Sequence, residues 1–240
     1  MKIINAKDYS EMSKKAAEII IDEISKKPNL VMGLATGSTP LGIYQELVKA
    51  YKKRKINFSK IKSFNLDEYY SIKRKDKNSF YYFMHKNLFS KINIKKENVN
   101  SLDGEAKNPE KECENYENKI RKNKIDIQIL GVGVNGHIGF NEPGSGINSR
   151  TRLVKLASQT LKDNSRFFRG KMPRYALSMG ISSIMRAKKI ILLASGKNKA
   201  RAINQLIEGK VNKKWPVSFL RKHKNLVIVL DKDAASLPED

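Results

Sequence analysis

The sequence has few of the features that mark secreted, membrane or disulfide-stabilised proteins. Cys113 is the single cysteine, so no internal disulfide can form, as is typical of proteins in a reducing compartment. No apolar run approaches the roughly 20 residues that a membrane span needs. The N-terminal stretch MKIINAKDYSEMSKK lacks the apolar core of a secretion signal. We therefore expect a cytoplasmic protein with no membrane partner, and the polar residues around Cys113 predict a thiol at the surface.

Acidic residues are also scarce. The chain has 24 Asp and Glu against 48 Lys and Arg, which gives a formal net charge of +24. Such an excess can indicate a nucleic-acid partner. The lysines, however, are spread from Lys2 to Lys232, and no RNA-binding aromatic motif, zinc knuckle or basic zipper is present. We expect no nucleic-acid partner. A general attraction for anionic small substrates and a bias in codon usage both remain as explanations.

Short apolar runs alternate with helical patterns along the 240 residues. Runs rich in Ile, Val and Leu are typical of strands buried on both faces of a parallel sheet. Helical spacing of apolar residues predicts helices over 40–54 and 197–210, and DYSE resembles a capping box before a helix over 12–24. The predicted strands are LVMGLA (30–35), IKSFNL (61–66), IDIQILGVG (125–133), KIILLASG (189–196) and NLVIVLD (225–231).

This alternation predicts one α/β domain over residues 1–240, a doubly wound, mostly parallel sheet with helices on both faces, as in Rossmann-like folds. The least regular part, 142–174, is interpreted as a long connection that forms a lid or binding loop. In such sheets ligands bind beyond the carboxyl ends of the strands. Three predicted strands end there in polar or glycine-rich clusters, TGST, DEYY and GVNGHIGFNE.

The cluster GLATGSTP combines a strand, a glycine turn with hydroxyls and a proline that can begin a helix. Its turn would direct the backbone N–H groups of Gly37, Ser38 and Thr39 at an anion near the helix N-terminus. The spacing is neither that of a Walker A loop nor that of GxGxxG. An ordinary helix-capping turn explains the pattern equally well.

Two further clusters bring in acid–base groups. FNLDEYY places Asp67 at a strand end, as a general base or as a cap of the next helix. In GVNGHIGFNEP, Gly133 and Gly136 allow close approach of the backbone, and His137 could present one ring nitrogen to a substrate. Glu142 and Asn135 are candidates to fix the other nitrogen. His137 shares no ligand spacing with the other histidines or the cysteine, so we expect no metal site.

Arg166, in NSRFF, and Lys199, in SGKNKA, are candidates for phosphate contacts. A guanidinium suits bidentate contact with phosphate, and an ammonium adds a point charge. In so basic a chain, either side chain could equally be a solvated surface charge.

Together these stretches resemble the glucosamine-6-phosphate deaminase family. LATGSTPLGIYQEL, FNLDEY, SFYYFMHKN, GVGVNGHIGFNEPGS, SRTR, NSRFF, YALSMGISSIM and GKNKARAI follow in the family's order over nearly the whole chain. The resemblance implies conversion of glucosamine 6-phosphate and water to fructose 6-phosphate and ammonia, without metal or organic cofactor. A related sugar-phosphate hydrolase resembling 6-phosphogluconolactonase, or a non-catalytic sugar-phosphate sensor, is the alternative.

The resemblance also implies roles for the candidates. Asp67 would move the proton between C2 and C1, and His137 would open the pyranose ring, oriented by Glu142 and Asn135. The residues expected to hold the 6-phosphate are Ser38, Thr39, Arg166 and Lys199, with the Gly37 turn beside them.

Two departures from the family pattern carry expectations. Asn135 stands where some members have Asp, so we expect a lower kinetic pKa for ring opening than in those members. Val154 stands where allosteric hexameric members have a basic residue, two positions after the arginine that matches Arg152, and those members also have a longer C-terminal segment. We expect an unregulated monomer or small homo-oligomer; activation by N-acetylglucosamine 6-phosphate would contradict this.

Overall fold

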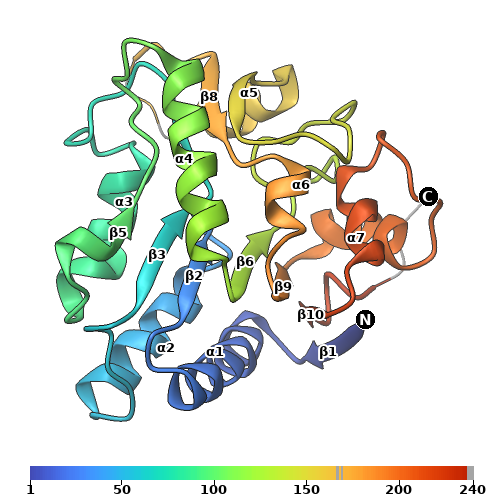
Figure 1. Ribbon diagram of the computed structural model, residues 1–240. Coiled ribbons are helices and arrows are strands. Elements are labelled where there is room, and N and C mark those ends of the chain that lie inside the picture. Colours follow the sequence, from blue (N-terminus) through green and yellow to red (C-terminus); the bar gives the residue numbers. More distant parts are fainter. Residues whose placement is uncertain (166–167, 169, 237–240) are drawn as a thin grey trace.

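A computed structural model describes residues 1–165, 168 and 170–236. Its main element is a parallel sheet of seven strands (Figure 1), which confirms the predicted fold class. All five predicted strands are present, within a few residues of the predicted bounds. In sheet order the strands are β1 (Lys2–Ala6), β10 (Leu226–Asp231), β9 (Lys189–Ala194), β6 (Ile127–Gly131), β2 (Val31–Leu34), β3 (Lys62–Asn65) and β5 (Val99–Asn100).

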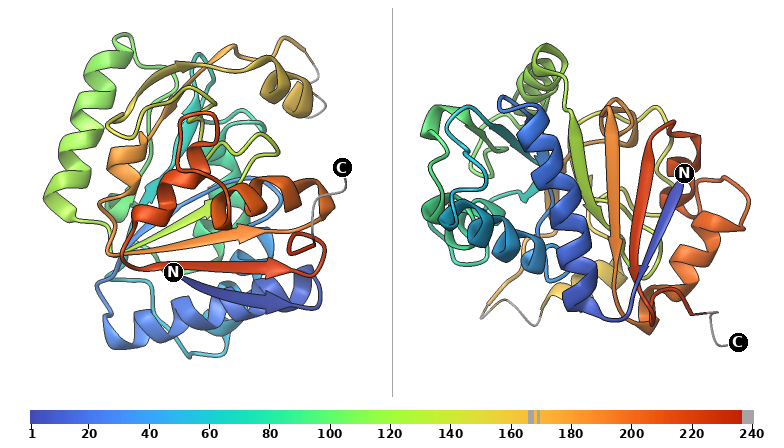
Figure 2. Two further views of the ribbon diagram at one scale, coloured as in Figure 1. Left: turned by 90° about the vertical axis from the view of Figure 1, so that its right-hand side faces the viewer. Right: turned by 90° about the horizontal axis from the view of Figure 1, so that it is seen from below.

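Helices cover both faces of this sheet (Figure 2). On one face the core is formed with α1 (Tyr9–Lys26), α2 (Leu41–Lys52) and α3 (Phe80–Asn87). On the other it is formed with α4 (Pro109–Asn123), α6 (Ile181–Ile184), α7 (Ala200–Ile207) and the 3₁₀ turn Pro216–Lys222. The remaining short 3₁₀ segments are Phe89–Lys91, Lys96–Asn98 and Lys197–Lys199. Among the described residues, no helix has both the length and the hydrophobicity for a membrane crossing.

Helix α1 illustrates how the sequence sets an element. Asp8 caps it, because its Oδ1 accepts a hydrogen bond from the N–H of Glu11 at 2.8 Å, as the DYSE pattern predicts. Glu11 in turn accepts from the N–H of Lys7 at 2.7 Å. Met12, Ile20 and other apolar residues at helical spacing then face the sheet.

A second, antiparallel sheet was not predicted. It consists of β4 (Asp67–Tyr69), β8 (Tyr175–Ser178) and β7 (Arg152–Lys155), with α5 (Ser158–Ser165) following β7. The connection 142–174 is thus less irregular than predicted, since it contains β7 and α5. Tyr69 and Phe140 form the centre of a third apolar cluster, in which Leu161 of α5 also packs. This cluster fixes the small sheet and α5 beside the carboxyl ends of the main strands.

Cys113 corrects another expectation. Its side chain is 2% exposed and packs in the core with Tyr116 and Ile120 of α4, so it is not a surface thiol. The three residues lie at helical spacing and share the inward face of a helix that is otherwise polar. Burial raises the pKa of the Cys113 thiol to about 12, so the thiol stays protonated near neutral pH.

Candidate active site

The polar clusters meet where the strand order reverses. The chain runs from β2 outward through β3 and β5, then returns so that β6 pairs with the other side of β2. Ligand sites in doubly wound folds lie at such a switch point, beyond the carboxyl ends of the strands. The turn containing Ser38 follows β2, and the loop containing His137 follows β6. The topology therefore brings these two segments together.

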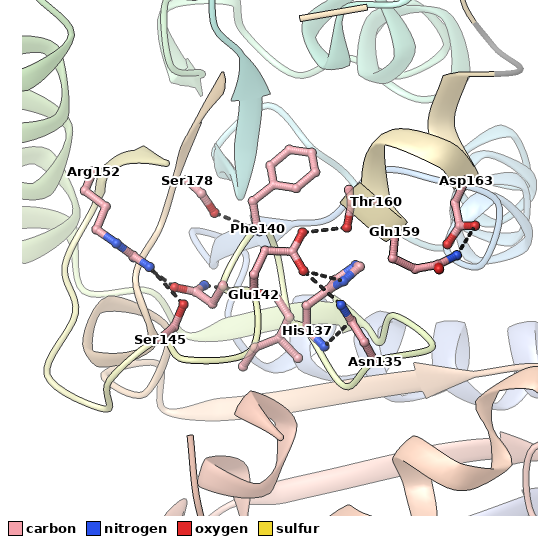
Figure 3. Close-up of polar contacts among 12 residues, drawn as sticks. Asn135, His137, Phe140, Glu142, Ser145, Arg152, Gln159, Thr160, Asp163 and Ser178 are labelled. Carbon is pink, nitrogen blue, oxygen red and sulfur yellow. Dashed lines mark hydrogen bonds and ion pairs between the residues drawn. The ribbon is translucent and has the colours of Figure 1, made fainter. Parts of the chain in front are cut away.

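The carboxylate of Glu142 is the centre of the polar network beyond β6 (Figure 3). Its Oε2 accepts a hydrogen bond from Asn135 Nδ2 at 3.0 Å and lies 3.4 Å from His137 Nδ1. Its Oε1 accepts from Thr160 Oγ1 at 2.5 Å. Asn135 Oδ1 also accepts from the backbone N–H of His137 at 3.2 Å. The structure therefore brings together the three predicted residues of this loop and adds Thr160.

Each member of this network has a distinct relation to the imidazole. Asn135 contacts the backbone of His137 and the carboxylate of Glu142, and only Glu142 approaches the ring. His137 Nδ1 has no hydrogen-bond partner among the described residues, so the contact with Glu142 is electrostatic at this separation. Burial by itself raises the pKa of Glu142, but His137, Thr160 and Asn135 together lower it to about 2. Glu142 is thus ionised throughout the neutral range.

Two glycines allow this loop geometry, as predicted. Gly133 N–H donates to the carbonyl of His137, which folds the ring back over the glycine. A Cβ at Gly133 would lie 2.2 Å from His137 Cε1. Gly136 has φ +79°, and a Cβ there would lie 2.6 Å from Trp215 Cε3. The glycines therefore let both the imidazole and the 3₁₀ region after Trp215 pack directly on the loop backbone.

Asp67 is the first residue of β4 and is 5% exposed. It pairs with Ser178 of β8, whose Oγ accepts a hydrogen bond from the N–H of Phe140 at 3.0 Å. Ser178 therefore contacts both the strand of Asp67 and the loop of His137. Burial, and then the neighbouring charge of Glu68, raise the pKa of Asp67 to about 8.

Glu68, and not Asp67, has the helix-capping role that was the alternative interpretation of DEYY. Its carboxylate accepts hydrogen bonds from the N–H groups of Phe80 and Tyr81, at the start of α3, at 2.9 and 2.8 Å. The helix-capping role thus belongs to Glu68, and Asp67 is left without such a partner among the described residues.

The turn after β2 has the geometry of an anion-binding loop. Gly37 has φ +98°, and Ser38 is exposed, with its carbonyl accepting from Tyr9 Oη at 2.9 Å. The N–H groups of Gly37, Ser38 and Thr39 donate to no acceptor within the described residues. They are free to bind an anion at the N-terminus of α2.

Of the two predicted basic residues, Lys199 lies in a short 3₁₀ segment after β9, just before α7, and is half-buried. Burial lowers its pKa, and the carboxylate of Asp163 in α5 acts in the opposite direction. Arg166 lies outside the described residues. No group of His, Cys, Asp and Glu in the described ranges could hold a metal ion.

Thr160 and Ser178 were missed by the sequence reasoning. Thr160 lies in a polar helix without apolar periodicity, and Ser178 is the last residue of a strand of four. In the sequence, neither hydroxyl can be told from that of a surface residue. Their roles become visible only in the structure, where segments remote in the sequence lie against each other.

Comparison with known proteins identifies the family of the chain. Residues 6–229 match the family of glucosamine-6-phosphate isomerases and 6-phosphogluconolactonases. A protein of Clostridium novyi (strain NT) named glucosamine-6-phosphate deaminase is 53% identical, over 98% of this chain and 99% of its own. The chain belongs to this family. A relative of the same name from Thermoanaerobacter sp. (strain X514) is 52% identical, over 100% of this chain and 96% of its own. The resemblance noted in the sequence is thereby confirmed.

Solved structures of related proteins share the fold of this chain. The structure of a monomeric glucosamine-6-phosphate deaminase has a TM-score of 0.96 and 41% identity, and covers 99% of this chain and 100% of its own. The 6-phosphogluconolactonase from Trypanosoma cruzi has a TM-score of 0.78 and 22% identity, over 98% and 95%. That second likeness supports the shared fold alone.

Proposed function

We propose that this protein is a glucosamine-6-phosphate deaminase, which converts glucosamine 6-phosphate and water to fructose 6-phosphate and ammonia. The observation that carries the proposal is the ionised Glu142 beside the His137 imidazole, at the switch point of the sheet. The strand of Asp67 is connected to the same loop, because Ser178 pairs with Asp67 and accepts a hydrogen bond from Phe140. Relatives that bear this name match 98% or more of the chain at 52–53% identity.

The first chemical task is ring opening. The closed sugar has no free carbonyl, so a group must move a proton between the C1 hydroxyl and the ring oxygen. Imidazole suits this step because it changes charge near neutral pH. His137 has this role in our proposal. The Glu142 carboxylate, 3.4 Å from Nδ1, stabilises the imidazolium, while Nε2 is the nitrogen that can face the substrate.

The second task is proton transfer from C2 to C1. Asp67 removes the C2 proton and delivers it to C1, and a second proton passes from the amine nitrogen to the C1 oxygen. The aldehyde carbon thereby becomes an alcohol and the amine carbon an imine. Water then hydrolyses the imine to a ketone and releases ammonia. A base works best when its pKa lies near the operating pH, and the pKa of Asp67, about 8, meets that condition.

The third task is holding the phosphate away from the reacting carbons. The free N–H groups of Gly37, Ser38 and Thr39 and the half-buried Lys199 are our candidates, together with Arg166. Binding energy at this remote group can orient C1 and C2 over the acid–base pair. No cofactor is needed for these steps.

We further infer that the protein acts in the cytoplasm as a monomer or small homo-oligomer. Sugar phosphates are charged and stay where they are made, and the 41%-identical deaminase is described as monomeric. Val154 lies in β7 and packs against the third apolar cluster, in place of a basic residue. Sedimentation analysis with and without N-acetylglucosamine 6-phosphate tests the assembly.

The decisive experiment is ammonia release from glucosamine 6-phosphate by the parent protein and by Asp67→Asn and His137→Gln. Loss of general acid–base help typically costs about 10²–10⁴-fold, and we expect losses in this range for both variants. His85→Gln is the matched control, because His85 is exposed on α3. Retained activity in Asp67→Asn would remove the base. Hydrolysis of 6-phosphogluconolactone in place of ammonia release would indicate the alternative function.

A further inference from the structure

Helix α5 joins three parts of the candidate site. The Thr160 hydroxyl contacts Glu142, and Asn164 Nδ2 donates to Tyr69 Oη in β4 at 3.1 Å. Asp163 acts electrostatically on Lys199. Asp163 and Asn164 stand three and four positions after Thr160, so both lie on the turn that follows it. The helix therefore contacts the loop of His137 and the strand that begins at Asp67, and it carries a carboxylate near the candidate phosphate end.

The hydrogen bond to Glu142 comes from a buried side chain. Thr160 is 3% exposed and is the buried residue of α5. Its hydroxyl reaches Glu142 Oε1, the oxygen that neither His137 nor Asn135 contacts. One donor on each carboxylate oxygen prevents rotation of the carboxylate plane, which keeps Oε2 directed at the imidazole (Figure 3).

We propose that Thr160 is a positioning residue of the deaminase, which holds the Glu142 carboxylate in the orientation that His137 needs for ring opening. This inference rests on the proposed function. Among the described residues, Thr160 makes no hydrogen bond to the imidazole or to the proposed base, so its polar link to the acid–base pair runs through Glu142. The orientation of the Glu142 carboxylate therefore depends on the position of α5.

The test compares Thr160→Val, which keeps the shape and removes the hydroxyl, with Thr160→Ser, which keeps the hydroxyl. Because hydrogen bonds to charged groups are among the stronger ones, we expect Thr160→Val to lower kcat by about 10-fold with KM within about two-fold. Thr160→Ser restores kcat to within about two-fold of the parent. Ser165→Ala is the control, since Ser165 is an exposed hydroxyl of the same helix that bonds the Lys162 carbonyl.

A double-mutant cycle separates positioning from a general loss of packing. If Thr160 acts through Glu142, Thr160→Val costs less than about two-fold in a Glu142→Gln background. Thermal unfolding of every variant verifies that the fold is intact. Equal losses in Val and Ser, losses that multiply in the double variant, or a fully active Thr160→Val would each overturn the proposal. A parent that releases no ammonia would overturn the proposed function and this inference with it.

Discussion

At the scale of single residues, Asp67 and Glu142 differ because of their surroundings. Both carboxyl groups are largely removed from water, which raises the pKa of each. Glu142 has hydrogen-bond donors on both oxygens and an imidazole nearby, and its pKa falls to about 2. Asp67 faces the charge of Glu68, and its pKa rises to about 8. One group is thus a fixed charge and the other can exchange a proton.

The raised pKa of Asp67 predicts a stability cost that Asp67→Asn removes. An Asp ionises near pH 4 in the unfolded chain and near pH 8 in the folded one. Between these values the unfolded state binds fewer protons, so the free energy of unfolding falls as pH rises through the window. An Asn side chain does not titrate, so the variant lacks this loss of stability. We expect Asp67→Asn to melt at a higher temperature than the parent at pH 8 and at the same temperature near pH 4.

Calorimetry across this pH range is the measurement, with Asp22→Asn as control because Asp22 is exposed on α1. Equal melting temperatures at pH 8 would contradict the prediction. The expected result is a variant that is inactive but more stable than the parent above pH 4, as occurs where function requires an unfavourable buried charge.

Asn135 gives a second prediction at this scale. Its amide donates to Glu142 Oε2, whereas an Asp would place a second carboxylate at that position, 3.0 Å from the first. Two carboxylates favour the imidazolium form of His137 more than one does. We expect the acid limb of the pH–rate profile of Asn135→Asp to move to higher pH. Asn148→Asp, an exposed change of equal charge in the same connection, controls for net charge; an unshifted limb in Asn135→Asp would refute the argument.

At the scale of elements, a helix or strand could be predicted where its apolar residues formed a long enough run or a clear periodic pattern. The five predicted strands are continuous apolar runs, and all are present. The missed strands of the small sheet have three or four residues, too few for a period to emerge. Helix α5 has one buried residue, so tertiary contacts rather than an apolar stripe define it. These missed elements are the ones that fix the small sheet and Thr160 at the site.

The loop after β6 is where backbone geometry most directly sets the chemistry. Gly133→Ala would place a Cβ 2.2 Å from the imidazole of His137, and the ring or the loop must shift. Gly131 stands two residues earlier, and a Cβ there would meet nothing within 4 Å. Misplacement of a catalytic group by about 1 Å can cost about 100-fold. We expect a loss of this order in kcat for Gly133→Ala and near-parental kcat for Gly131→Ala.

Steady-state kinetics of the two alanine variants, with circular dichroism to compare their folds, tests this expectation. Equal activity in both would mean that the loop accommodates the extra carbon without moving the imidazole.

At the scale of the whole molecule, the rule that ligands bind beyond the carboxyl ends of parallel strands brought remote residues together correctly. It predicted that the polar segments at the ends of the strands 61–66 and 125–133 would lie near one another, although they are remote in the sequence. It could not predict how Asp67 and the loop of His137 are connected. Ser178 connects them, because its backbone pairs with Asp67 in β4 and its hydroxyl accepts a hydrogen bond from Phe140 in the loop. Fold-level rules locate the site, and side-chain contacts between remote elements complete it.

The net charge of +24 is also a property of the whole molecule. A strongly positive protein attracts an anionic substrate over a distance that salt controls, about 30 Å at 0.01 M and about 8 Å at 0.15 M. We expect kcat/KM for glucosamine 6-phosphate to fall as sodium chloride is raised through this range, with kcat at saturation unchanged. Buffers without phosphate or sulfate are needed, because those anions compete for the candidate phosphate loop. A kcat/KM independent of salt would mean that the lysines reflect composition alone, and that capture of the substrate depends on the short-range donors of Gly37, Ser38 and Thr39.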